Sequence, residues 1–164
     1  MRTPASIAGH PIHPMLVPIA IGGFVLSFVF DIVCLATGQT SPWLTVAYYT
    51  MVGGIVGALA AAGFGALDLF SLPAGHTKNV GFTHMGLNLA VVALFICNAW
   101  LRHANPEGSG GAPFLMSIAG IVLLAIAGWL GGKLVFEGAV GVSGGAEPAT
   151  NAEIRTGRRD ARYN

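Results

Sequence analysis

The chain has 164 residues, of which 54% are hydrophobic and only 9% are charged. Soluble domains usually carry about 25% charged residues, so this composition excludes an ordinary water-soluble protein and indicates an integral membrane protein. The formal net charge is +1, which gives no sign of a nucleic-acid partner or an acidic one. Cys34 and Cys97 stand far apart in apolar segments without C-x-x-C spacing, and we interpret them as small buried residues.

Four apolar segments are each long enough to cross a membrane, because about 20 helical residues span a hydrocarbon layer of about 30 Å. The segments run over residues 14–37, 43–70, 82–101 and 113–136. Their short connections are rich in turn-forming residues, so successive helices should run antiparallel. The sequence therefore predicts an all-α fold, an integral membrane up-down four-helix bundle over residues 1–142.

The two ends of the chain differ from these segments. Residues 143–164 are polar and are predicted to form a flexible tail. The first apolar segment is too long for a cleaved signal peptide, and only Arg2 precedes it as a cation, so we expect a retained membrane helix. No repeat at the spacing of a solenoid or propeller is visible.

The cationic residues predict the orientation in the membrane. An up-down bundle places the N-terminus, the loop at 71–81 and the tail on one side. The cations of this side are Arg2, Lys78, Lys133, Arg155, Arg158, Arg159 and Arg162. The opposite side carries Arg102 alone, so the positive-inside rule predicts an inner-membrane protein with both termini in the cytoplasm.

Polar side chains gather at the predicted cytoplasmic end. His10 and His13 precede the first helix, and each is followed by a proline that disfavours helical backbone, so we expect a stiff extended hook. The other members are Asp68 in the last turn of the second helix, His76 in the next loop, His84 in the first turn of the third helix and Glu137 at the end of the fourth. Ionisable residues at membrane depth are costly, so this group is the strongest functional signal in the sequence.

These residues form two overlapping candidate sites. The candidate cofactor ligands are His10, His13, His84 and Asn88, and the candidate metal ligands are His10, His13, Asp68 and His84. Asn88 lies one helical turn after His84 and shares its face. Plain alternatives exist, because an interfacial histidine can be a polar anchor and Asp68 can cap a turn or pair with Lys78.

Asp31 and Asn98 lie towards the far ends of the first and third helices. Asp31 belongs either to a proton path or, as the simpler interpretation, to a contact with water or with another helix. The sequence contains no Ser or Cys in an activating motif and no complete phosphate-binding loop. Hydrolytic and nucleotide chemistry are therefore not predicted, and whether the protein is an enzyme stays open.

Several segments resemble a known family. They read GHPIHPMLVPIAIG, LDLFSLP, HMGLN and GWLGGKLVFEGAVGV. Over about residues 8–142 the chain resembles an uncharacterised family of small bacterial four-helix membrane proteins with a GHPxHP signature, some of which are fused to Rieske-type iron–sulfur domains. The resemblance implies a membrane topology and an association with redox proteins, and it assigns no activity. The family often has histidine where this chain has Gly138 and glutamate where it has Lys133, so a site that needs that histidine has lost one ligand here.

Three functions are compatible with the polar end. Haem b held between one histidine of the hook and His84 would make a membrane electron carrier. Haem-binding bundles more often place both axial histidines deep inside helices, where only His84 is expected here. A non-haem Fe, Cu or Zn ion could be held by imidazoles and Asp68. In the third alternative, the histidines bind no cofactor and serve only to organise the helix bundle, which is then a subunit of a larger membrane complex.

We favour the redox site with haem b, in a lipid bilayer and with a membrane electron-transfer partner or larger complex. Covalent haem attachment is excluded because the chain contains no C-x-x-C-H motif. No nucleic-acid partner is predicted.

Overall fold

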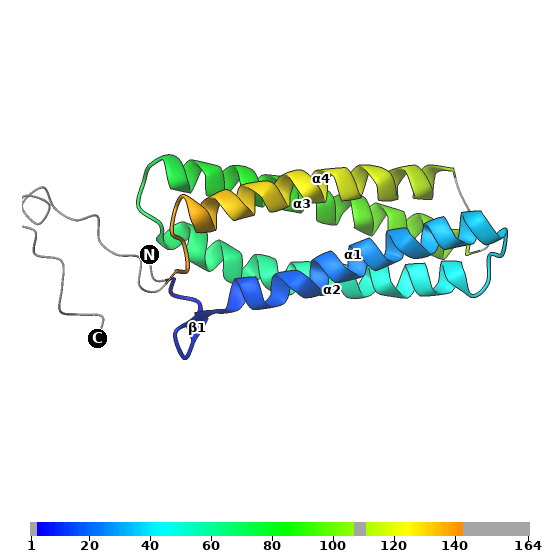
Figure 1. Ribbon diagram of the computed structural model, residues 1–164, viewed down its shortest axis with the longest axis horizontal. Helices are drawn as coiled ribbons and strands as arrows, with labels where there is room; N and C mark the ends of the chain where they lie inside the picture. Colours follow the sequence, from blue (N-terminus) through cyan, green and yellow to red (C-terminus); the bar gives the residue numbers. More distant parts are fainter. Residues whose placement is uncertain (1–2, 107–110, 143–164) are drawn as a thin grey trace, which may run out of the picture.

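Four long helices form the protein. The computed structural model describes residues 3–106 and 111–142, so the predicted tail at 143–164 lies outside the described residues. The helices are α1 (Ile12–Thr37), α2 (Trp43–Ser71), α3 (His76–Ala104) and α4 (Ala112–Phe136). They run alternately up and down, so the start of α1, the α2–α3 connection and the end of α4 share one end, the N-terminal end (Figure 1). The predicted all-α up-down bundle is confirmed.

All four helices are long and apolar enough to cross a membrane. Their outward faces carry large apolar side chains, such as Trp100 and Trp129, which are about three-quarters exposed. Such faces need lipid around them, and helices satisfy their backbone hydrogen bonds internally, as a bilayer requires. The chain is therefore a multi-pass membrane protein with four candidate spans.

The third helix is longer at both ends than the sequence predicted. It begins at His76 and ends at Ala104, whereas residues 82–101 were expected. His76 is therefore the first residue of α3 rather than part of a loop, and Arg102 lies in its last turn. His84 lies in the third turn rather than the first. The apolar pattern marks only the part of a helix inside the membrane, so polar turns beyond that part were read as loops.

The opening histidine-proline segment is extended only in its first half. His10–Pro11 forms strand β2, which pairs antiparallel with β1 (Ser6–Ile7). His13 is the second residue of α1, so the prediction that it belongs to an extended hook is wrong. Pro14 is tolerated because the first four N–H groups of a helix have no acceptor within the helix, and no hydrogen bond is lost there.

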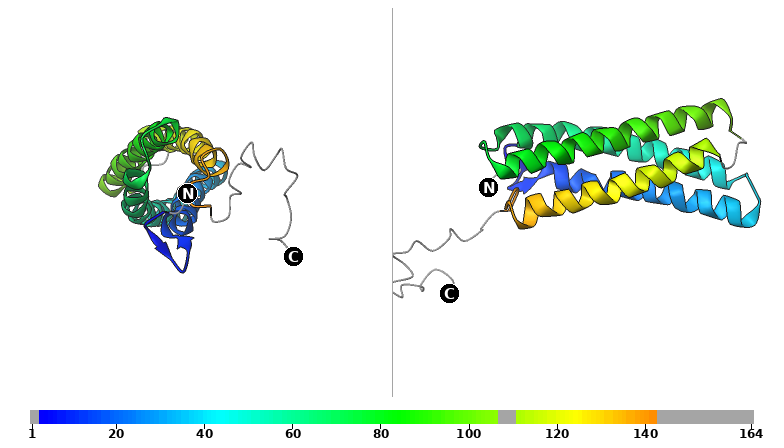
Figure 2. Two further views of the ribbon diagram at one scale, coloured as in Figure 1. Left: turned by 90° about the vertical axis from the view of Figure 1, so that its left-hand side faces the viewer. Right: turned by 90° about the horizontal axis from the view of Figure 1, so that it is seen from above.

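The bundle consists of two helical hairpins, α1–α2 and α3–α4. Helices α1 and α2 approach closely at Gly23 and Gly54, where a Cβ on Gly23 would lie 2.6 Å from the Gly54 Cα. Between the hairpins, α2 packs on α3 and α1 on α4, so α1 and α3 lie diagonally opposite each other (Figure 2). Phe24 and Phe95 meet on this diagonal at the centre of the core.

Candidate functional site

Two of the five histidines meet inside the bundle near its N-terminal end. His13 comes from the first turn of α1 and His84 from the third turn of α3. Their ring centroids are 6.4 Å apart and their ring planes are nearly perpendicular, at 87°. Both side chains are half-buried. Because α1 and α3 are diagonal, the pair reaches across the bundle.

Each imidazole is fixed by a backbone carbonyl of the partner helix in its own hairpin. Nδ1 of His13 lies 2.8 Å from the Ala61 carbonyl oxygen, and Nδ1 of His84 lies 2.9 Å from that of Ala127. A carbonyl can only accept, so each Nδ1 carries the hydrogen, and Nε2 of each neutral ring keeps its lone pair. A histidine that binds a metal commonly donates its other ring N–H to a carbonyl in this way.

A glycine lies beside each ring, one turn beyond the carbonyl that holds it. A Cβ on Gly65 would lie 2.7 Å from Nδ1 of His13, and a Cβ on Gly131 would lie 3.1 Å from Cε1 of His84. No side chain fits at Gly65 without a shift of the ring, and Gly131 leaves little more room. The two imidazoles therefore pack directly on the backbones of α2 and α4.

Asn88 lies against the His84 ring. Its side-chain amide donates to the His84 carbonyl oxygen at 2.8 Å, and the amide nitrogen is 3.2 Å from Nε2 and 3.4 Å from Nδ1. Nearly equal distances to both ring nitrogens place the amide over the ring face rather than in the ring plane. Asn88 thus supports the ring without taking up the in-plane lone pair of Nε2.

The other two predicted ligands lie outside this pair. His10 is exposed, and its Nδ1 is 3.1 Å from the Ala8 carbonyl oxygen. Asp68 is buried, and its Oδ1 accepts the N–H of Ala5 at 3.0 Å. Within residues 3–106 and 111–142, no three His, Cys, Asp or Glu side chains come close enough to hold one metal ion. The grouping of His10, His13, Asp68 and His84 around one ion does not form there.

Lys78 and Glu137 have structural partners at the same end. Lys78 Nζ donates to the carbonyl oxygens of Phe70 and Leu72, at 3.2 and 2.8 Å, so it caps the end of α2. The Asp68 carboxylate accepts from the N-terminal segment instead. Glu137 is exposed and lies 3.7 Å from Lys133, one turn before it.

Gly138, where the resembled family often has histidine, is tightly packed. A Cβ at this position would lie 2.7 Å from the Thr77 side chain and 2.7 Å from the Leu134 carbonyl oxygen. A histidine would therefore need the start of α3 to shift. The histidine pair is complete without a residue from this position.

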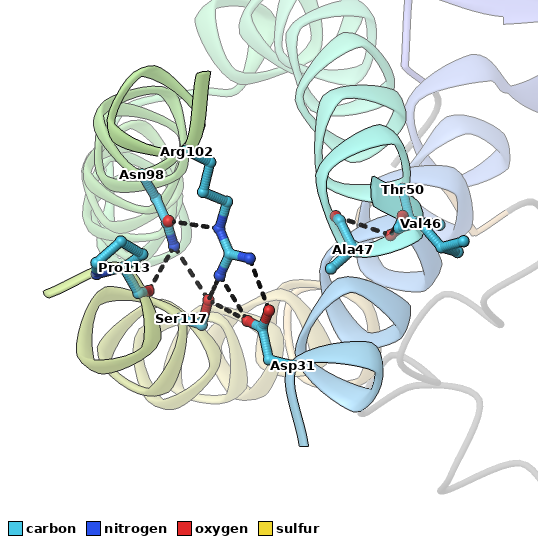
Figure 3. Close-up of polar contacts among 8 residues, drawn as sticks. All are labelled: Asp31, Val46, Ala47, Thr50, Asn98, Arg102, Pro113 and Ser117. Carbon is cyan, nitrogen blue, oxygen red and sulfur yellow. Dashed lines mark hydrogen bonds and ion pairs between the residues drawn. The ribbon is translucent and has the colours of Figure 1, made fainter. Parts of the chain in front are cut away.

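A second polar cluster lies at the opposite end of the bundle (Figure 3). Arg102 and Asp31 form a two-pronged ion pair, with both N···O distances at 2.7 Å, and both residues are buried. Ser117 donates to Asp31 at 2.9 Å, and Arg102 donates to Asn98 at 2.9 Å. The interpretation that Asp31 contacts another helix is confirmed.

Sequence reasoning missed the role of Arg102 because it placed this residue in a loop. A signal was present, since Arg102 follows Asp31 by 71 residues. The same separation relates His84 to His13 and Phe95 to Phe24.

A second constant separation relates the other helices of the two hairpins. A step of 66 residues pairs Gly54 with Gly120, Ala61 with Ala127 and Gly65 with Gly131. The α1–α2 and α3–α4 hairpins therefore carry equivalent residues at equivalent places. They are related by an approximate two-fold axis along the bundle. This spacing is longer than the period of about 20–50 residues that is typical of solenoid and propeller repeats.

Residues 9–144 match the family model described as "Predicted membrane protein (DUF2231)". The chain matches no curated protein and no solved structure. Because the family match covers most of the chain, the protein belongs to this family, as its motifs indicated.

Proposed function

We propose that this member of the DUF2231 family of predicted membrane proteins is an electron-transfer protein that binds haem b between His13 and His84. The observation that carries the proposal is the pair of imidazoles opposed across the bundle, each with Nδ1 engaged by a carbonyl. Cofactor sites in helix bundles are commonly made by side chains on facing helices. Bound haem b would supply a one-electron couple within the apolar interior.

The spacing of the rings is compatible with two residues that would hold one metal. Imidazole nitrogens bind metals at about 2.0–2.1 Å. The ring centroids of His13 and His84 are 6.4 Å apart, so both imidazoles would be within reach of one haem iron.

The number of donors favours haem over a bare ion. A protein-bound zinc ion usually takes three or four ligands from side chains, whereas a porphyrin supplies four of its iron's ligands itself. In the described part of the chain, two imidazoles meet and no third His, Cys, Asp or Glu joins them. His13 and His84 would supply the ligands that a haem iron takes from the protein.

The surrounding residues would orient the ligands. The carbonyls of Ala61 and Ala127 select the tautomer that leaves Nε2 free in each ring. Gly65 and Gly131 allow each ring to lie against a helix backbone. His13 lies within the first turn of α1 and His84 about 12 Å into α3, so the site would lie near one membrane surface, within reach of a soluble or membrane partner.

The proposal places the N-terminal end in the cytoplasm. Lys78 and Lys133 lie at this end. Arg102, the cation expected on the other side, is instead buried in an ion pair inside the bundle. Among the described residues, the opposite end therefore has no exposed Lys or Arg. The difference in exposed cations between the two ends, on which the positive-inside rule depends, is larger as a result.

The test is the absorption spectrum of the purified protein after expression with added haem precursor and titration with haem. The expected result is a Soret band and a sharp reduced α-band, typical of low-spin haem with two imidazoles. His13→Ala and His84→Ala should each abolish this spectrum. His76→Ala and His103→Ala, which change histidines outside the pair, should retain it.

Three results would contradict haem binding between His13 and His84. A colourless protein with about one Fe, Cu or Zn per chain would support a non-haem metal site. A protein without haem or metal that co-purifies with a larger membrane complex would support a structural subunit. A haem spectrum that survives in His13→Ala and His84→Ala would place the haem elsewhere.

A further inference from the structure

We infer that Asp31 and Arg102 are positioning residues for the histidine pair. The ion pair at one end of the approximate two-fold axis sets the spacing of α1 and α3 at the other end, where His13 and His84 meet. The role in ligand positioning rests on the proposed function. The spacing itself is measurable without any bound group.

The diagonal helices α1 and α3 touch through equivalent residues at three levels. His13 faces His84 at one end, Phe24 stacks on Phe95 in the middle, and Asp31 binds Arg102 at the other end. The members of each pair are separated by 71 residues in the sequence. With about 1.5 Å of rise per residue, the ion pair lies about 27 Å along α1 from His13.

The ion pair is the most directional of these three contacts. Nη1 of Arg102 donates to Oδ1 of Asp31 and Nη2 donates to Oδ2, at 2.7 Å each. Two parallel charge-assisted bonds fix the angle as well as the distance between the groups. The stacked rings of Phe24 and Phe95, with centroids 4.0 Å apart, can slide over each other at little cost.

Neighbouring side chains join α4 to this contact. Ser117 of α4 donates to Oδ2 of Asp31 and accepts from Arg102 at 3.2 Å. Asn98 donates to Ser117 and to the Pro113 carbonyl oxygen, at 3.0 and 2.9 Å. Three of the four helices are therefore tied together at this end, as Figure 3 shows.

The packing of the bundle explains how the ion pair can affect the distance between His13 and His84. Within each hairpin the two helices pack closely along their length, whereas packing between the hairpins is sparser. Each hairpin therefore behaves as one unit that can rotate against the other about the Phe24–Phe95 stack. A change of the ion pair at one end would then change the distance between His13 and His84 at the other.

The test measures the spacing of α1 and α3 in the full-length, haem-free protein in lipid nanodiscs. Nitroxide labels on the exposed positions Met15→Cys and Leu89→Cys report the distance by pulsed electron paramagnetic resonance, after Cys34 and Cys97 are replaced by alanine. The charge variants are Asp31→Arg, Arg102→Asp and the double reversal, with Asp31→Asn as a milder change.

We expect a narrow distance distribution in the parent protein and a broadened or shifted one in each single variant. The double reversal should restore the narrow distribution, because the two positions are equivalent across the axis. The matched control is Glu137→Gln, which breaks an exposed ion pair and should change nothing. Ser117→Ala keeps both charges and should produce a smaller change of the same kind, which keeps the test informative if a charge variant does not fold.

Unchanged distance distributions in Asp31→Asn and Ser117→Ala would overturn the inference. The same variants are then titrated with haem, and their low-spin spectra are compared. If the distances change in the variants but the parent protein binds no haem, the proposed function is rejected and the effect of the ion pair on helix spacing is still supported. Altered distances with an unchanged low-spin spectrum would reject the role in ligand positioning.

Discussion

The imidazoles of His13 and His84 are held by contacts that tolerate almost no added atom. A Cβ at Gly65 would lie 2.7 Å from the His13 ring, whereas a Cβ at Gly131 would lie 3.1 Å from the His84 ring. Gly65→Ala should therefore weaken haem binding by about tenfold or more, in the range seen when groups that orient a metal ligand are lost. Gly131→Ala should have a smaller effect.

Haem titration followed by absorbance measures both affinities. Gly63→Ala on the same helix is the control, because a Cβ there would meet no atom within 4 Å. If Gly65→Ala binds haem as tightly as Gly63→Ala does, the ring does not need its contact with the α2 backbone.

At the scale of the helices, the apolar pattern was sufficient to predict the spans but not their ends. Helices α2 and α4 begin and end within one residue of the expected bounds, because lipid-facing apolar residues fill them. The turns at 76–81 of α3 are polar and project beyond the apolar part, so they carry no such signal. The prolines of the opening segment predicted extended backbone at His13, but α1 already includes Pro14 in its first turn. A proline there breaks no helical hydrogen bond.

The candidate site was predicted in part for similar reasons. Alternating helix direction places His13 and His84 at the same end, and that could be inferred from the sequence. The contacts of the rings with the carbonyls of Ala61 and Ala127 could not be inferred, because they depend on how each helix is rotated about its own axis. Arg102 was missed through an error of a single turn at the end of α3.

The contact between α1 and α3 also has a consequence for stability. Removal of one partner of a buried ion pair leaves an uncompensated charge and costs about 3–5 kcal/mol. Arg102→Gln should therefore lower the free energy of unfolding by about that amount, whereas Glu137→Gln, at an exposed pair, should lower it by about 0–1 kcal/mol. Unfolding by SDS in mixed micelles measures the difference, and equal losses in the two variants would contradict the account.

At the scale of the whole molecule, the two-fold relation means that each half contributes one residue to the histidine pair. The α1–α2 hairpin supplies His13 and Gly65, and the α3–α4 hairpin supplies His84 and Gly131 in equivalent positions. In the proposed function, each half would supply one of the two histidines that hold the haem. Asp31 and Arg102 depart from the symmetry in charge, and their opposite signs favour the pairing of one half with the other.

The orientation of the whole bundle gives a prediction that needs no cofactor. We place this end of the bundle in the cytoplasm. Green fluorescent protein fused after residue 142 should therefore be fluorescent, and alkaline phosphatase fused at the same position should be inactive. Reporters inserted between α2 and α3 should behave in the same way, since this connection lies at the same end. Active phosphatase at either position would reverse the proposed orientation.

We propose that one haem b is held between the two halves of the bundle by His13 and His84. Haem titration of the purified protein in nanodiscs is the decisive measurement. We expect saturation at one haem per chain with a low-spin, two-imidazole spectrum that is lost in the His13→Ala/His84→Ala double variant. Non-saturable haem uptake, or the same spectrum in the double variant, would contradict it.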